Sequence, residues 1–291
     1  MSSFVISLLR AEERRHHIVN EFGKKQVEFE FFDAITPELN VAQAQKLGIN
    51  LENTVLGPGE VSCLLSHVTL WHHAVTEQLP YITIFEDDVF LGANAGVFLN
   101  EYQWIPKNCD VIKLEGFSPQ IITSIWPTHH LPSHRKLYRL KHKHMGAAGY
   151  VLSLRAAREL LEYARNHYPL RPVDHIIFDD YIVAESLPVL QMLPALCVQD
   201  YILNHEDNQS NALPSYLEQD RLEIRKIFPK FKPKIKQPVL PKVKLSLFGK
   251  TKREAWRPIQ QVLQLPAKME AKWSVKNAEF NAPADSFRHL A

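Results

Sequence analysis

Short apolar segments rich in β-branched and aromatic residues alternate along this chain with longer segments that carry helical patterns. We predict strands over residues 4–9, 27–32, 81–85, 110–114 and 150–153. We predict helices over residues 10–20, 60–78 and 154–168. Strands that alternate with helices indicate an α/β fold with a mostly parallel sheet covered on both faces.

Length and composition are close to those of ordinary soluble globular proteins. The 291 residues allow one large domain with an appendage or two modest domains, and the 45% hydrophobic and 23% charged fractions exclude a disordered or fibrous chain. No apolar run approaches the roughly 20 residues that cross a bilayer, so we predict no membrane span and no signal peptide. Three cysteines without CxxC spacing argue against a disulfide framework and fit a reducing cytoplasm.

The C-terminal part differs in charge from the rest. Residues 221–257 hold thirteen Lys or Arg against Glu223 and Glu254, with four prolines among them. We therefore predict a catalytic domain over 1–225 and a basic, partly helical extension over 226–291. The extension is interpreted as an attachment to an anionic membrane surface, with a solvated arm as the alternative; nucleic-acid binding is not expected, because no recognised module accompanies it.

Three consecutive acids, Glu86-Asp87-Asp88, follow the predicted strand 81–85. Open α/β sheets bind ligands at the carboxyl ends of their strands. Side chains alternate along a strand, so Glu86 and Asp88 are expected on one side and Asp87 on the other. Adjacent carboxylates need a compensating cation, and hard oxygen ligands suit Mn²⁺ or Mg²⁺. The alternative is a solvated turn after the strand.

Further short motifs accompany the triplet, in a specific order and spacing. They are Val5-Ile-Ser-Leu8, Glu13-Arg14-Arg15, Phe31-Phe-Asp-Ala34, Gly59-Glu60, Cys63-Leu-Leu-Ser-His67, Leu70-Trp71, Ile84-Phe-Glu-Asp-Asp-Val89, Gly146-Ala-Ala-Gly-Tyr150, Pro172-Val-Asp174 and Pro194-Ala195-Leu196. Together they make residues from about 4 to 225 resemble glycosyltransferase family 25, the lipooligosaccharide galactosyltransferases and their relatives.

The resemblance implies an inverting, metal-dependent enzyme of the GT-A type, a nucleotide-binding α/β/α sandwich. Its implied donor is UDP-galactose, and its implied acceptor is a terminal sugar of lipooligosaccharide, linked β and most simply β1,4. It implies that Glu86 and Asp88 are metal ligands. Enzymes of the GT-A type often supply a late histidine as a further ligand, and His205, which lies outside the family motifs, is the candidate here. The expected donor-site residues are Ser7, Leu8, Arg14, Arg15, Asp33, Ala34, Ser66, His67, Asp87, Gly146 and Gly149. Outside the family motifs, Gln209 and Ser210 are candidates to hydrogen-bond the diphosphate or an ordered water.

Inverting transfer is a single displacement in which one carboxylate takes the proton of the acceptor hydroxyl. We predict Asp174 as this base, with Asp179 and Asp180 as rivals. The alternative for Asp174 is an acid that stabilises a helix N-terminus.

These features place the protein in the cytoplasm of a Gram-negative bacterium, peripheral on the inner membrane, where a lipid-linked oligosaccharide would meet a nucleotide sugar. A homo-oligomer stays open. Two other functions are weighed: a non-catalytic module that binds a nucleotide sugar or a glycan, and a metal-dependent hydrolase, for which the chain lacks a second acidic cluster.

Overall fold

The computed structural model describes residues 2–52, 54–117, 121–167, 169–184, 187–204 and 213. The predicted extension 226–291, its boundary near 225 and the residues His205, Gln209 and Ser210 lie outside this described part of the chain. No helix among the described residues is both long and apolar enough to cross a membrane.

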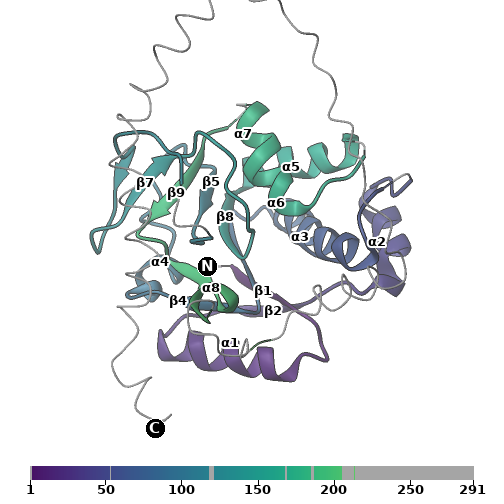
Figure 1. Ribbon diagram of the computed structural model, residues 1–291, viewed down its shortest axis with the longest axis horizontal. Helices are drawn as coiled ribbons and strands as arrows, with labels where there is room; N and C mark the ends of the chain where they lie inside the picture. Colours follow the sequence, from purple (N-terminus) through teal and green to yellow (C-terminus); the bar gives the residue numbers. More distant parts are fainter. Residues whose placement is uncertain are drawn as a thin grey trace, which may run out of the picture.

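Strands and helices alternate as the sequence indicates (Figure 1). The strands are β1 (Ser3–Ser7), β2 (Glu30–Asp33), β3 (Tyr81–Glu86), β4 (Val89–Leu91), β5 (Val111–Lys113), β6 (His129–His130), β7 (Lys136–Arg139), β8 (Gly149–Ser153), β9 (Val189–Leu193) and β10 (Cys197–Gln199). The helices are α1 (Glu12–Lys24), α2 (Asn40–Leu47), α3 (Pro58–Thr76), α4 (Ala95–Leu99), α5 (Leu154–Asn166), α6 (Val173–His175), α7 (Tyr181–Ala184) and α8 (Asp200–Asn204). Two short turns complete them, η1 (Pro37–Leu39) and the π-helical η2 (Ile176–Asp180).

Within the described residues, eight strands form one sheet in the order β2-β1-β3-β8-β5-β9-β7-β6, and β10 and β4 form a two-stranded ribbon. Pairing is parallel for β2-β1-β3 and for β5-β9, whereas β8 and β7 run antiparallel to their neighbours. Strands β1, β2, β3, β5, β6 and β9 therefore share one direction. Their common direction brings the carboxyl ends of β1, β2, β3 and β5 to the same edge as the start of β8.

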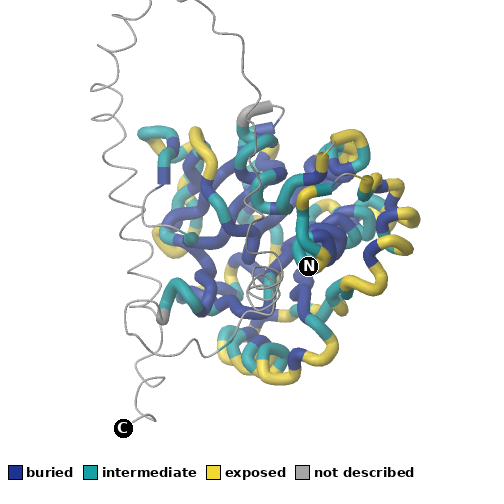
Figure 2. The backbone as a smooth tube through the Cα atoms, turned by 45° about the vertical axis from the view of Figure 1, so that its right-hand side comes forward, coloured by how far each residue is buried: buried dark blue, intermediate teal, exposed yellow. Residues whose placement is uncertain are grey.

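Both faces of the sheet are covered, which confirms the predicted α/β class. On one face, α3 and α5 bury their apolar side chains against Phe4, Ile6 and Ile84. On the other face, α1 and α4 pack against Val5 and Phe85. The alternation of Phe4, Val5 and Ile6 between the two cores is the period-2 pattern of a central strand. Figure 2 shows these inner strands as buried and the outer surface of the helices as exposed.

Element boundaries deviate from the sequence prediction where local geometry interrupts a strand. The predicted strand 27–32 begins only at Glu30, because Gln26 has a positive φ of 54° and Val27 donates its N–H back to Phe22 at the end of α1. The first strand ends at Ser7 instead of residue 9, since Ala11 N donates to Leu8 O and turns the chain into α1. The histidine-rich stretch 129–144 contains the β6–β7 hairpin.

Candidate active site

The carboxyl edge of the sheet gathers the residues expected at the donor site from β1 and β2. Ser7 and Asp33 are paired in register at the ends of these strands, and Ala34 donates its N–H to Ser7 O at 2.9 Å. Arg15 of α1 ties this corner together, because it forms an ion pair with Asp33 and donates to Leu8 O at 3.2 Å and to Ser7 O at 3.1 Å. The two strand ends are thereby fixed beside the acid triplet.

The acid triplet begins at the last residue of β3 and turns into β4. Asp87 accepts from Ser7 Oγ at the end of β1 at 2.7 Å and pairs with Arg14 of α1. Glu86 and Asp88 instead converge, because both accept from Gln199 Nε2, each at 3.2 Å. Glu86 and Asp88 thus lie together and Asp87 lies apart, but the reason is a turn at Asp87 and Asp88 between β3 and β4 and not the alternation of a continuous strand.

Glu86 and Asp88 carry more negative charge than their surroundings compensate. Burial, followed by Asp87 and Asp174, raises the pKa of Glu86 to about 7. Burial, followed by the charge of Glu86, raises the pKa of Asp88 to about 7 as well. Because too little positive charge lies nearby, both carboxylates bind protons at a higher pH than usual. Their oxygen atoms are hard ligands. This donor set therefore fits a divalent cation such as Mn²⁺ or Mg²⁺.

Arg14 holds the triplet from the α1 side. Its guanidinium pairs with Asp87, lies 3.5 Å from Asp88 Oδ2 and donates to Leu213 O at 3.3 Å. The side chain is only 11% exposed. In this arrangement Arg14 fixes the acid loop, and its approach to a diphosphate stays a prediction.

His67 of α3 lies beneath Glu86 and is fully buried. Trp71 Nε1 donates to Tyr150 Oη at 3.0 Å, and Tyr150 Oη lies 2.7 Å from His67 Nδ1. The tyrosine hydroxyl satisfies both neighbours if it accepts from Trp71 and donates to Nδ1, which leaves the imidazole proton on Nε2. Nε2 lies 3.6 Å from Glu86 Oε1. Burial lowers the pKa of His67 to about 3, so the ring is neutral at pH 7.

Two neighbours of His67 on α3 have different surroundings. Ser66 Oγ accepts from Ile35 N at 2.9 Å and donates to Ser62 O at 2.8 Å, so it holds the segment after β2 against α3. Cys63, His67 and Glu86 each offer one ligand atom, and these atoms lie within 4.8 Å of one another. The donor-binding roles of Ser66 and His67 stay predictions.

Asp174 is the predicted base that lies nearest the triplet. It accepts from Gly146 N at 3.2 Å and from His175 N at 2.9 Å, and its charge helps to raise the pKa of Glu86. Asp179 and Asp180 are instead paired with Arg171, and Tyr163 Oη donates to Asp180 at 3.1 Å. The structure therefore brings one of the three candidate bases toward the acids.

Gly146 and Gly149 are required by neighbouring protein atoms. Gly146 has φ +85°, and a Cβ there would lie 2.6 Å from Glu115 Oε1. A Cβ on Gly149 would lie 2.3 Å from Cys197 Sγ. Glycine is thus needed at both positions for packing under the site, whatever their approach to a ligand.

Comparison with known proteins gives a family for this site. The model described as "Glycosyltransferase family 25 (LPS biosynthesis protein)" matches residues 1–177, which contain the acid triplet and Asp174. The chain belongs to glycosyltransferase family 25.

Named relatives align over most of this family 25 chain. The lacto-N-neotetraose biosynthesis glycosyltransferase LgtB of Neisseria meningitidis serogroup B is 38% identical over 241 residues, 78% of this chain and 85% of the relative. The lipooligosaccharide biosynthesis protein lex-1 of Haemophilus influenzae is 32% identical over 304 residues, 92% and 97% of the two chains. The lipooligosaccharide biosynthesis protein lic2B of Haemophilus influenzae is 36% identical over 264 residues, 86% and 92%.

Sequence reasoning missed a buried ion pair at the end of β5 in this family 25 chain. Lys113 Nζ donates to Met145 O at 2.7 Å, to Gly146 O and to Glu115 Oε2 at 3.3 Å. Glu115 Oε2 also accepts from Ala148 N at 3.0 Å. Burial lowers the pKa of Lys113 and raises that of Glu115. The signal was present in the sequence, because Lys113 and Glu115 are charged residues on one side of an otherwise apolar strand.

Gln199 is the second missed residue, and no local signal marks it. It reaches the acids because β10 pairs with β4, the strand that follows the triplet. A pairing between segments so far apart in sequence cannot be read from the periodicity of either one.

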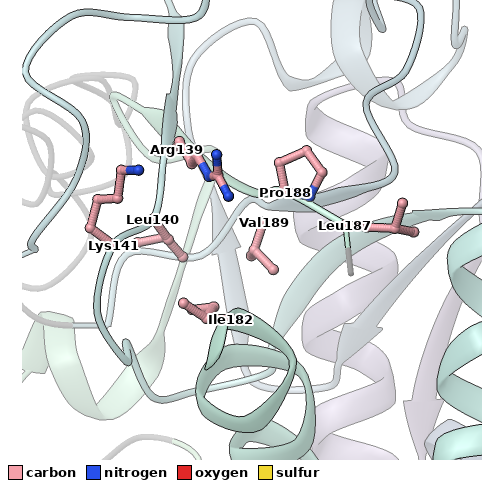
Figure 3. A pocket seen from close by; sticks show the side chains of 7 residues that line it. All are labelled: Arg139, Leu140, Lys141, Ile182, Leu187, Pro188 and Val189. Atoms are coloured by element: carbon pink, nitrogen blue, oxygen red, sulfur yellow. The ribbon is translucent and has the colours of Figure 1, made fainter. Parts of the chain in front are cut away.

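The hollow drawn in Figure 3 is a separate feature. It has a volume of about 50 Å³ and is lined by the end of β7, the start of β9 and Ile182. The start of β9 lies at the sheet edge opposite the acids, because β9 runs parallel to β5. Ligand pockets usually measure about 300–1,000 Å³. This hollow is therefore too small for a nucleotide sugar, and the acid edge remains the candidate site.

Proposed function

We propose that this family 25 protein is an inverting, metal-dependent galactosyltransferase of the GT-A type. It moves galactose from UDP-galactose to a terminal sugar of lipooligosaccharide and forms a β linkage, β1,4 in the simplest case. The observation that carries the proposal is the convergence of Glu86 and Asp88 at the carboxyl edge of the sheet, with raised pKa values. The relatives LgtB, a glycosyltransferase by name, and lex-1 and lic2B, lipooligosaccharide biosynthesis proteins by name, support the reaction class and the acceptor.

Glu86 and Asp88 would hold Mn²⁺ or Mg²⁺. The bound cation would supply a Lewis acid to neutralise charge on the leaving diphosphate. Ser7 and Arg14 keep the acid loop in position through Asp87. His205, Gln209 and Ser210, which lie outside the described residues, stay candidates for the remaining metal and diphosphate contacts.

Asp174 performs the proton transfer in this proposal. The acceptor oxygen forms a bond to the anomeric carbon while the bond from that carbon to the diphosphate oxygen breaks. The acceptor proton passes to an Asp174 carboxylate oxygen, and UDP leaves. Two backbone N–H groups, from Gly146 and His175, keep this carboxylate in a fixed orientation.

The proposed acceptor also suggests where in the cell the enzyme works. Its lipid-linked sugar would lie at the cytoplasmic face of the inner membrane of a Gram-negative bacterium. The basic stretch 221–257 would attract the enzyme to that anionic surface, each Lys or Arg near the surface adding about 1 kcal/mol.

The metal site is tested by titrating Mn²⁺ into the protein with UDP-galactose and a short lactose-type or glucose-terminated glycan, while UDP release is followed. Asp88→Ala should abolish Mn²⁺-dependent release, because it removes one of the two converging carboxylates. Glu101→Ala, which removes an exposed acid elsewhere, should retain full release. Full activity of the Asp88→Ala variant would overturn the metal assignment. Ligand binding without any turnover would favour a nucleotide-sugar or glycan-binding module.

The base is tested with Asp174→Asn. This variant should bind UDP and Mn²⁺ like the wild type but transfer galactose about 10²–10⁴-fold more slowly, because the amide cannot accept the proton. Binding is measured by calorimetry and transfer by product formation. Asp179→Asn is the matched control and should retain turnover. Wild-type turnover of the Asp174→Asn variant would move the role to Asp179 or Asp180.

A further inference from the structure

Gln199 is the last residue of β10, and β10 is placed beside the acids by its neighbour β4. The antiparallel ribbon pairs Gln199 with Val89 and Cys197 with Leu91. The next residue, Asp200, donates its N–H to Asp88 O at 2.8 Å. The backbone on both sides of Gln199 is therefore fixed relative to the acid triplet, and its side chain is buried at 9% exposure.

The side-chain amide of Gln199 lies between the two converging carboxylates. Nε2 lies 3.2 Å from Glu86 Oε2, 3.2 Å from Asp88 Oδ1 and 3.4 Å from Asp88 Oδ2. A neutral amide supplies two N–H protons for these three oxygens and adds no net charge. The amide group thus occupies the position between the two carboxylates where a cation would bind, but the amide itself carries no charge.

We propose that Gln199 is a protein ligand of the divalent cation beside Glu86 and Asp88, through Oε1 after a half-turn of its terminal amide. The proposal rests on the metal site of the proposed function. Rotation about the terminal bond of a glutamine is soft, and the amide oxygen and nitrogen are nearly equal in size. Side-chain carbonyl oxygens are ordinary ligands of hard divalent cations. A neutral ligand also leaves the charge of the two carboxylates matched to one M²⁺ ion.

The rival role for Gln199 is a positioning one, in which Nε2 keeps donating to both carboxylates and never contacts the metal. The two roles predict opposite effects of Gln199→Glu. A glutamate offers an oxygen ligand but no N–H, so a metal ligand is retained and a positioning donor is lost. Gln199→Leu removes both functions and weakens metal binding under either role.

The experiment measures Mn²⁺ binding by the full chain with electron paramagnetic resonance, without any turnover. We expect Gln199→Leu to lower Mn²⁺ affinity about 10–100-fold and Gln199→Glu to bind at least as tightly as the wild type. Gln199→His should add a nitrogen coupling to the spectrum of the bound Mn²⁺, which shows that the side chain at position 199 lies within bonding distance of the ion. Gln43→Glu, which adds the same charge on α2, should leave the affinity unchanged. Circular dichroism confirms that each variant is folded.

The outcomes separate two failures. If the wild type binds no Mn²⁺, or if Asp88→Ala binds it equally well, the metal site of the proposed function is wrong. If Asp88→Ala abolishes binding while Gln199→Glu weakens it as much as Gln199→Leu and Gln199→His shows no nitrogen coupling, the acids hold the metal and the ligand role of Gln199 is overturned. Loss of binding in Cys63→Ala would assign the metal to the Cys63, His67 and Glu86 group instead.

Discussion

At the scale of single residues, the acid pair destabilises the protein that holds it. Asp88 is 9% exposed and lies against the same amide as Glu86, so two like charges share a poorly solvated place. Both pKa values are raised to about 7, above the ordinary 4.5 of Glu and 3.8 of Asp. Between these limits the folded protein binds more protons than the unfolded chain. Without a metal, the free energy of unfolding therefore falls as the pH rises from about 4 to about 7.

Asp88→Asn should remove much of this penalty. In EDTA at pH 8 we expect the variant to be more stable than the wild type, by on the order of 1–3 kcal/mol, because an amide carries no charge to bury. At pH 4 the difference should shrink, since Asp88 is then protonated in the folded wild type. Urea unfolding at the two pH values measures both.

Added Mn²⁺ provides the control for this pH effect. It should stabilise the wild type at pH 8 but not the Asp88→Asn variant, because binding to the folded state alone raises stability. A wild type that is more stable at pH 8 than at pH 4 in EDTA, with no gain from Asp88→Asn, would contradict the electrostatic account.

At the scale of elements, the loop before β8 connects a buried ion pair to the candidate base. Lys113 and Glu115 at the end of β5 contact this loop at Gly146 and Ala148, and Asp174 accepts from Gly146 N. Gly146 is in the left-handed region, and the space beside its Cα is filled by Glu115 and Phe117. One residue thus couples the buried ion pair to the candidate base.

Gly146→Ala should disturb both the Lys113–Glu115 ion pair and the position of Asp174. The new methyl group has no room and the backbone conformation is unfavourable for alanine, so we expect a loss of about 1–3 kcal/mol in stability and a lower transfer rate. Gly23→Ala is the matched control: nothing lies within 4 Å of a Cβ at that position of α1, and alanine favours a helix by up to about 1 kcal/mol over glycine. Thermal unfolding and UDP release compare the two variants. Equal effects would refute the packing argument.

Elements could be predicted from the sequence where a pattern within the segment itself marks them. Strand β3 and helices α3 and α5 follow from apolar periodicity, and the acid triplet follows from its place at a strand end. The reversed direction of β8 and the β10–β4 ribbon did not follow, because strand pairing depends on contacts between distant segments. Gln199 could not be predicted for this reason. Lys113 and Glu115 could have been, because two charged residues two positions apart at the end of an apolar strand indicate a buried ion pair.

At the scale of the whole molecule, two apolar cores on opposite faces of the sheet hold the fold together. Every residue of both cores, among those described, precedes Asp200. The predicted catalytic domain 1–225 thus includes both of these cores. The basic stretch 221–257 lies almost entirely after it.

A chain ended at residue 225 should keep the fold and lose the proposed membrane contact. We expect its unfolding midpoint and its Mn²⁺-dependent UDP binding to match those of the full chain, because both cores and the acids are retained. Sedimentation with phosphatidylglycerol vesicles should pull down the full chain at low salt but not the shortened one. Phosphatidylcholine vesicles are the control. Vesicle binding by the shortened chain would contradict the assigned role of the basic stretch.

The β10–β4 ribbon also has a consequence for how the protein is made. Asp88 and Gln199 are 111 positions apart, so the acids emerge from the ribosome well before β10, the strand that carries Gln199. At about 5–20 residues per second, this interval lasts roughly ten seconds. During that time the acid triplet has been synthesised and Gln199 has not. The site becomes complete only near the end of translation of the folded domain.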